Sequence, residues 1–205
     1  MKRFMQLAAM ASVCSCALTG IVRAATIVEF TEAVNTTEGV PGQSITTPVG
    51  GPFDNITFNF YADVAATVPA ASGDLFILTQ EYLGLPSGLS SSTPGFFAES
   101  TGVSGGVYLF DPSVILQGGT QYFFYGNQNF ITAVDTVNRY PGGVYYHAAQ
   151  PFFDFFTIPR LDQTFNLSGT EVTAVPTVPE PASLTLLGVG LAGIGARRWR
   201  QRKAS

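Results

Sequence analysis

Alternating hydrophobic and polar positions predict short β-strands over most of the chain. The clearest case is residues 56–62, where Ile56, Phe58 and Phe60 fall on one face and mainly polar residues on the other. Similar patterns predict strands at residues 26–30, 75–81, 107–110, 120–125, 144–148, 154–158 and 163–168, with Gly, Pro and Ser between them. No long stretch of this region has the helical period of about 3.6 residues. The sequence therefore predicts an all-β fold, a single β-sandwich or jelly-roll domain at residues 25–169.

The first 24 residues have a different pattern, that of a secretory signal peptide. Lys2 and Arg3 precede an apolar run at residues 4–18, and small or short side chains occupy the peptidase positions Val22 and Ala24. We expect cleavage between Ala24 and Ala25. Both cysteines lie in this segment, so the mature chain would have none. An alternative is a lipoprotein signal with Cys16 as the lipidated residue.

The C-terminal segment is a second apolar run that ends in a basic cluster. Residues 184–196 are uncharged and rich in Leu and Gly. We expect a transmembrane helix at about residues 182–196, which is short beside the usual length of about 20 residues. The cluster that follows consists of Arg197, Arg198, Arg200, Arg202 and Lys203. The positive-inside rule leaves this cluster in the cytoplasm and the β domain outside.

The tail resembles the PEP-CTERM sorting signal, which combines a Pro-Glu-Pro motif, a short apolar run and terminal arginines. Here the motif reads Val178-Pro179-Glu180-Pro181, after a predicted linker at residues 170–178, and the signal spans residues 179–203. The resemblance implies an exosortase substrate of a Gram-negative bacterium that makes exopolysaccharide. It implies the exosortase and the secretion machinery as partners, transit through the inner membrane, and delivery to the cell surface or medium.

The later half of the predicted domain has a weaker resemblance to choice-of-anchor surface domains. Residues 116–122, 141–146 and 162–169 fit their pattern of glycine turns followed by tyrosine-containing strands. The resemblance implies a galactose-binding type of sandwich. It transfers no site residue to this chain.

Charge is distributed unevenly along the sequence. The chain has a formal charge of −4, but all 14 acidic residues lie between residues 25 and 180, where Arg139 and Arg160 are the only cations. That region therefore has a charge of −12 and no lysine. Such a domain repels phosphate backbones, which excludes nucleic acid as a partner.

One catalytic pattern occurs, a G-x-S-x-G match at residues 102–106. Ser104 is followed by Asp111 or Asp135 and then by His147, the order of an α/β-hydrolase triad. A nucleophile elbow needs a helix after the serine, whereas residues 107–110 read as a strand. A hairpin turn explains the match, so we expect no enzyme, with a secreted hydrolase as the weakest alternative.

Metal and cofactor chemistry have little support. His147 is the only histidine and reads as a partly buried strand residue, so no multi-histidine metal site can form. The many carboxylates could bind calcium, but no dense ligand spacing such as D-x-D-x-D-G occurs. We expect no cofactor or metal, with calcium as an alternative.

Aromatic residues are the remaining candidates for binding. Dense clusters occur at residues 123–125, 152–153 and 155–156, and alternation places neighbouring rings on both faces of a sheet. Rings on an exposed face could stack on a sugar or contact a protein. The candidate platform comprises Tyr122, Tyr125, Tyr140, Tyr145 and Tyr146. The leading hypothesis is a structural or adhesive protein of exopolysaccharide or biofilm. The alternative is a carbohydrate-binding module, which predicts that these tyrosines are exposed.

Overall fold

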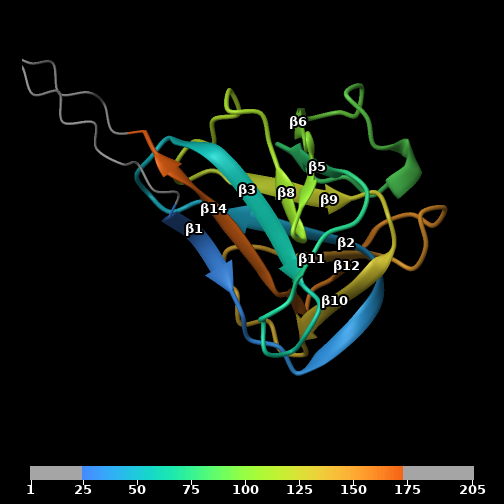
Figure 1. The fold of residues 1–205 in the computed structure, drawn as a ribbon. Helices are drawn as coiled ribbons and strands as arrows, with labels where there is room; N and C mark the ends of the chain where they lie inside the picture. The colour runs from blue at the N-terminus through green and yellow to red at the C-terminus, as the bar shows by residue number, and fades with distance from the viewer. Residues whose placement is uncertain (1–24, 173–205) are drawn as a thin grey trace, which may run out of the picture.

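The computed structural model describes residues 25–172, which form two antiparallel β-sheets (Figure 1). The predicted signal peptide and C-terminal helix lie outside these residues. The only helix within them is the short 3-10 helix η1 (Pro86–Gly88). No helix in this part of the chain has the length and hydrophobicity that crossing a bilayer requires.

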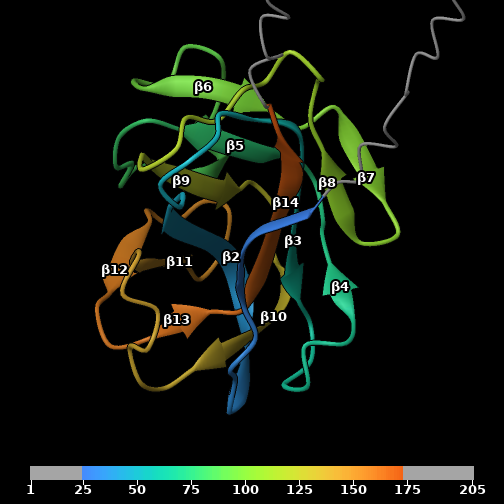
Figure 2. The same cartoon turned by 90° about the vertical axis from the view of Figure 1, so that its left-hand side faces the viewer.

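The first sheet has six strands. Its main path runs β1 (Ala25–Phe30), β14 (Phe165–Glu171), β3 (Phe53–Tyr61), β8 (Val107–Leu109) and β7 (Gly102–Ser104), and β4 (Pro69–Ala70) pairs with β3. Figure 1 shows β14 between β1 and β3, and Figure 2 shows β14 beside β3 from another side. The first and last strands of the domain are thus hydrogen-bonded neighbours, so both ends of the described chain lie at this sheet.

The second sheet has eight strands. Its path runs β12 (Phe156–Ile158), β11 (Tyr145–Ala148), β2 (Asn35–Thr46), β9 (Gln121–Gly126), β5 (Leu75–Leu78) and β6 (Phe96–Glu99). One end of β2 also pairs with β10 (Phe130–Asp135), which pairs in turn with β13 (Asp162–Gln163). The long strand β2 therefore holds both halves of this sheet together.

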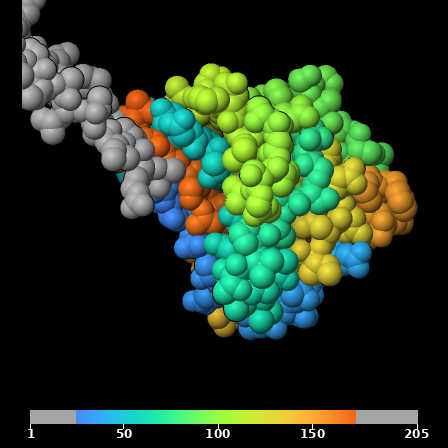
Figure 3. Space-filling model, in the orientation of Figure 1, coloured from blue at the N-terminus to red at the C-terminus, as the bar shows by residue number. Residues whose placement is uncertain are grey.

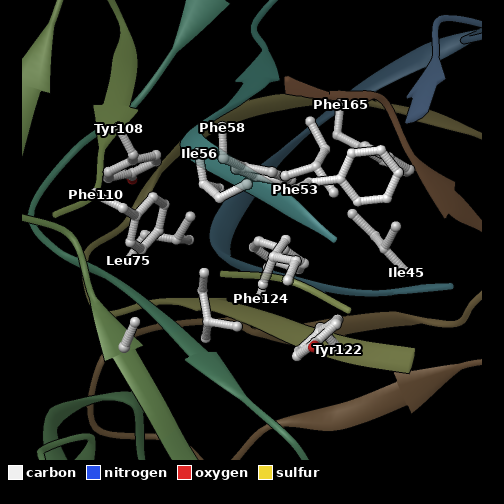
Figure 4. Close-up of a cluster of buried hydrophobic side chains, with 14 of the residues drawn as sticks. Ile45, Phe53, Ile56, Phe58, Leu75, Tyr108, Phe110, Tyr122, Phe124 and Phe165 are labelled. Atoms are coloured by element: carbon white, nitrogen blue, oxygen red, sulfur yellow. The ribbon is translucent and has the colours of Figure 1, made fainter. Parts of the chain in front are cut away.

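The main hydrophobic core lies between the two sheets (Figure 4). Phe58 of the first sheet stacks on Phe124 of the second, with ring centroids 4.7 Å apart, and makes an edge contact with Phe60 at 4.8 Å. Burying one such side chain contributes about 1.5–3 kcal/mol. Face-to-face packing through these rings is the arrangement of a β-sandwich.

A second apolar cluster lies on the opposite face of the eight-stranded sheet. Along β5, Leu75 and Ile77 join the main core, while Phe76 and Leu78 join this outer cluster. Its other buried members are Val40, Leu89, Tyr125, Tyr146, Ala148 and Phe155. The sheet is therefore buried on both faces, because loops at residues 82–89 and 149–155 cover the outer one.

All eight predicted strands overlap strands of the structure, and the domain is nearly all β. The expected boundary at Gly169 is passed by β14, which continues through Thr170 and Glu171 into the predicted linker. The longest strand, β2, was not predicted because its sequence, NTTEGVPGQSIT, reads as a loop. Its glycines are needed for close approach: a Cβ at Gly39 would overlap the His147 imidazole, and one at Gly42 would lie 2.6 Å from the Tyr125 ring.

Candidate functional site

The prediction of an exposed tyrosine platform is wrong. Four of its members are buried and the fifth is partly buried: Tyr122, Tyr125, Tyr145, Tyr146 and, partly, Tyr140. They divide between the two faces of the second sheet, with Tyr122 in the main core and Tyr125 in the outer cluster. Four of their hydroxyls are hydrogen-bonded within the domain, and Tyr125 Oη, for example, accepts a hydrogen bond from the backbone N–H of Tyr82 at 3.0 Å. These rings offer no stacking surface to a ligand.

The serine of the G-x-S-x-G match lies in a β-hairpin, as the sequence indicated. Ser104 ends β7 and pairs with Val107 at the start of β8, so a strand follows the serine in place of the helix of a nucleophile elbow. His147 lies in the other sheet, on β11. Its Nδ1 is hydrogen-bonded to the Tyr145 hydroxyl at 2.8 Å, and burial lowers its pKa. The histidine therefore has a structural partner within the strand.

A buried pair of carboxylates lies where β10 meets β13. Asp135 and Asp162 are directly opposite each other and both are fully buried. Asp162 Oδ2 accepts hydrogen bonds from the backbone N–H groups of Arg139 and Tyr140, each at 2.7 Å. Burial raises the pKa of Asp162, and the neighbouring charge of Asp135 adds to the effect. The pair thus fixes the turn that follows β10.

Arg139 supplies the positive charge beside this pair. Its Nε lies 3.4 Å from Asp135 Oδ2, and its Nη1 donates to exposed Glu32 at 2.7 Å. Between residues 25 and 172, no three His, Cys, Asp or Glu side chains converge as metal ligands.

A polar row crosses the outward face of the first sheet. Glu29, Asn166 and Asn59 are directly opposite one another on β1, β14 and β3. Glu29 Oε1 accepts hydrogen bonds from Tyr61 Oη at 2.7 Å and from Asn166 Nδ2 at 3.0 Å. Burial and the Glu29 carboxylate raise the pKa of Tyr61 to about 12. Glu29 is exposed and Asn166 is partly exposed, whereas Asn59 is buried and its side-chain amide donates to the backbone carbonyl of Phe60 at 2.9 Å.

The most exposed aromatic rings lie in the turn between β11 and β12, which projects at the edge of the molecule (Figures 1 and 3). Phe152 and Phe153 are 67% and 54% exposed, and their ring centroids are 5.1 Å apart with planes inclined by 43°. We call these two residues the aromatic tip. Large apolar side chains in such a position are typical of an interaction surface.

The aromatic tip is attached to the body of the domain by Phe155. This ring is buried in the outer cluster, 4.9 Å from the Tyr125 ring. The backbone N–H of Phe155 donates to Gly84 at 3.1 Å, and that of Ser87 donates to Pro151 at 3.2 Å. The turn is therefore tied to the neighbouring loop at residues 82–89, which carries two exposed leucines, Leu83 and Leu85. The cluster of phenylalanines at residues 152–156 was visible in the sequence, but the predicted binding platform was placed on the tyrosines.

The fold and surface thus define a β-sandwich domain without an assembled catalytic triad among the described residues. The family comparison places a PEP-CTERM protein-sorting motif at residues 177–202. The match contains Val178, Pro179, Glu180 and Pro181 together with the four arginines of the basic cluster, while Lys203 lies just beyond it. The chain therefore carries a PEP-CTERM protein-sorting motif, which indicates an exported protein that exosortase sorts through the membrane to the cell surface.

Neither the curated proteins nor the solved structures that were searched match this chain. The role of the β domain must therefore be argued from its own residues.

Proposed function

We propose that the β domain is a non-catalytic structural or adhesive component of the extracellular matrix, either exopolysaccharide or biofilm, of a Gram-negative bacterium. The sorting motif at residues 177–202 is the observation that carries this proposal, because it directs the chain to the cell surface. The surface chemistry supports it. The described residues include 13 carboxylates and two arginines, a charge of −11 that keeps an exported domain soluble.

The proposal is tested by following the full chain in its native host. Cells expressing the wild type are separated into inner-membrane, surface and matrix fractions, and the intact mass is measured in each. We expect a matrix form that begins at Ala25 and lacks residues 184–205. A chain that retains residues 184–205 and remains in the inner membrane would overturn the proposal.

A matched pair of variants separates the sorting motif from its surroundings. Changing Pro179, Glu180 and Pro181 to alanine should trap the chain in the membrane with its tail intact. Pro176→Ala changes a proline just outside the matched motif and should be processed like the wild type. Matrix retention is then assayed by washing the matrix fraction with high salt and with a neutral detergent.

A second candidate function is carbohydrate binding, favoured by Glu29 and Asn166, the two accessible members of the polar row. Amide and carboxylate groups can hydrogen-bond pairs of sugar hydroxyls, and the acidic domain would favour a neutral glycan over an acidic one. The probe is exopolysaccharide purified from the host, titrated by calorimetry. Asn166→Ala should abolish binding, whereas Asn138→Ala, which changes an asparagine on another surface, should not. Equal binding by both variants would exclude the row.

A further inference from the structure

We propose that the aromatic tip is a docking surface for a partner protein that offers an apolar pocket with a basic rim. The surface consists of Phe152 and Phe153, together with Leu83 and Leu85 of the loop to which the turn is bonded. This inference rests on the proposed adhesive role and names the contact surface and the class of partner.

The first support is that Phe152 and Phe153 are exposed although the apolar outer cluster, which buries Phe155, lies close by. Phe155, two positions beyond Phe153, is buried between Tyr82 and Tyr125, with ring centroids 6.3 and 4.9 Å away. A turn bond from the N–H of Phe153 to Gln150 at 3.0 Å and the bonds to loop 82–89 fix the backbone. Because these bonds already hold the backbone of the turn in place, binding a partner would cost the domain little conformational entropy.

The second support is the negative charge around the tip, which indicates the charge expected around the partner's pocket. Asp154 adjoins Phe153 and raises the pKa of Tyr82 by its charge, second to the effect of burial. Glu81 is exposed, immediately precedes the loop at residues 82–89, and accepts a hydrogen bond from Tyr146 Oη at 3.1 Å. Of the two described arginines, Arg160 follows β12 at the end away from the tip, and Arg139 is bonded to Glu32. Complementarity therefore calls for Lys or Arg around the partner's pocket.

The same observations disfavour other occupants. A second copy of the domain would bring together two surfaces of charge −11 each. An anionic lipid surface meets the same repulsion, and no lysine flanks the tip. The 43° inclination of the two rings gives no flat platform for consecutive sugar rings. A tilted pair fits a pocket that encloses both rings.

The test is site-specific photo-crosslinking of the full chain in its native host. A benzophenone amino acid replaces Phe153 in one strain and, as a matched control, exposed Val64 in another. We expect a discrete protease-sensitive adduct with one other protein from position 153 and none from position 64. An adduct at twice the chain mass, a lipid or glycan adduct, or no adduct would each overturn the proposal.

The partner recovered in this way is then purified and tested for direct binding. Its affinity for the full chain should fall about tenfold or more for Phe152→Ser combined with Phe153→Ser, the effect of losing a buried anchor. Raising the salt should weaken binding, since the basic rim is screened. Binding that is unchanged by the double substitution or by salt would refute the tip or the charge argument respectively.

These results are separable from those on matrix location. If the wild type is absent from the matrix but still forms the adduct, the proposed function fails and the docking surface stands. If the double variant remains in the matrix and the wild type forms no adduct, the docking surface fails and the proposed function stands.

Discussion

Asp135 and Asp162 face each other across β10 and β13 with both side chains fully buried. One arginine serves both: its Nε lies 3.4 Å from Asp135, and its backbone N–H donates to Asp162. Asp162 Oδ1 has no hydrogen-bond partner. Two carboxylates held in this way cannot both ionise without a cost, and the pKa of Asp162 is raised accordingly.

This pair predicts a specific pH dependence of stability. Because the folded-state pKa of Asp162 is raised above its unfolded value, the native state holds the proton more tightly. Its contribution to stability is fully present below the unfolded pKa and is lost as the pH rises through the folded pKa. Asp162→Asn should therefore gain stability relative to the wild type at pH 7 and lose that advantage in acid. Urea denaturation of both proteins from pH 4 to pH 7 measures the difference.

The wild-type curve alone would not isolate this effect. Asp63 and Asp111 have pKa values lowered chiefly by hydrogen bonds from Thr67 and Ser113, so their contributions run in the opposite direction. Asp111→Asn is the matched control, and its difference from the wild type should have the opposite pH trend. A flat difference between Asp162→Asn and the wild type would contradict the prediction.

Phe58 should be the most sensitive core position among the labelled rings of Figure 4. It joins the two sheets by stacking on Phe124, and it also contacts Phe60 and Phe165. Phe58→Ala should lower the free energy of unfolding by about 3–5 kcal/mol. Phe153→Ala, which truncates an exposed ring, should change it by about 0.5 kcal/mol or less. Urea denaturation distinguishes the two, and similar losses would contradict the assignment of core and tip.

Gly39 and His147 should be energetically coupled. A Cβ at Gly39 would overlap the imidazole, so Gly39→Ala should cost about 1–3 kcal/mol, while Gly102→Ala, with open space around it, should not. Removing the imidazole in Gly39→Ala/His147→Ala should recover part of the loss. A double-mutant cycle by denaturation gives the coupling energy. Additive losses would show that the strand is disturbed by something other than this contact.

Tyr61 should report on the polar row through its ionisation. Its pKa of about 12 is raised by burial first and by Glu29 second. Glu29→Gln should lower the Tyr61 pKa without returning it to the ordinary value, because burial remains. An NMR pH titration of the labelled tyrosine ring carbons measures this change. An unchanged Tyr61 pKa in the variant would mean that the Glu29 carboxylate does not act on it.

The sequence identified strands in both sheets, but it did not show which side chains of the second sheet are buried on its outer face. The alternation of Ile56, Phe58 and Phe60 identifies β3 because their polar neighbours face outward. Along β9, Phe124 enters the main core and Tyr125 enters the outer cluster. Loop 82–89 covers Tyr125, and a local sequence pattern does not predict a contact with a loop about forty residues away in the chain.

The strand β2 was missed for a related reason. Gly39, Pro41 and Gly42 predict a turn by local preference. Their place in the sheet depends on rings of other strands, His147 and Tyr125, that need the space the glycines leave. The aromatic tip was not predicted either. The sequence does not show that Phe155 is buried while Phe152 and Phe153 are exposed.

The position of β14 determines how this domain would carry a mechanical load. Its last residue, Glu171, leads toward the sorting segment, and its hydrogen bonds run to β1 on one side and β3 on the other. Antiparallel bonds lie across the strand, so a pull along the chain from this end loads both ladders in shear. Bonds loaded in this way must fail together, whereas an edge strand peeled from its end loses them one by one. A domain held by its C-terminal side would therefore resist tension at the strand nearest its tether.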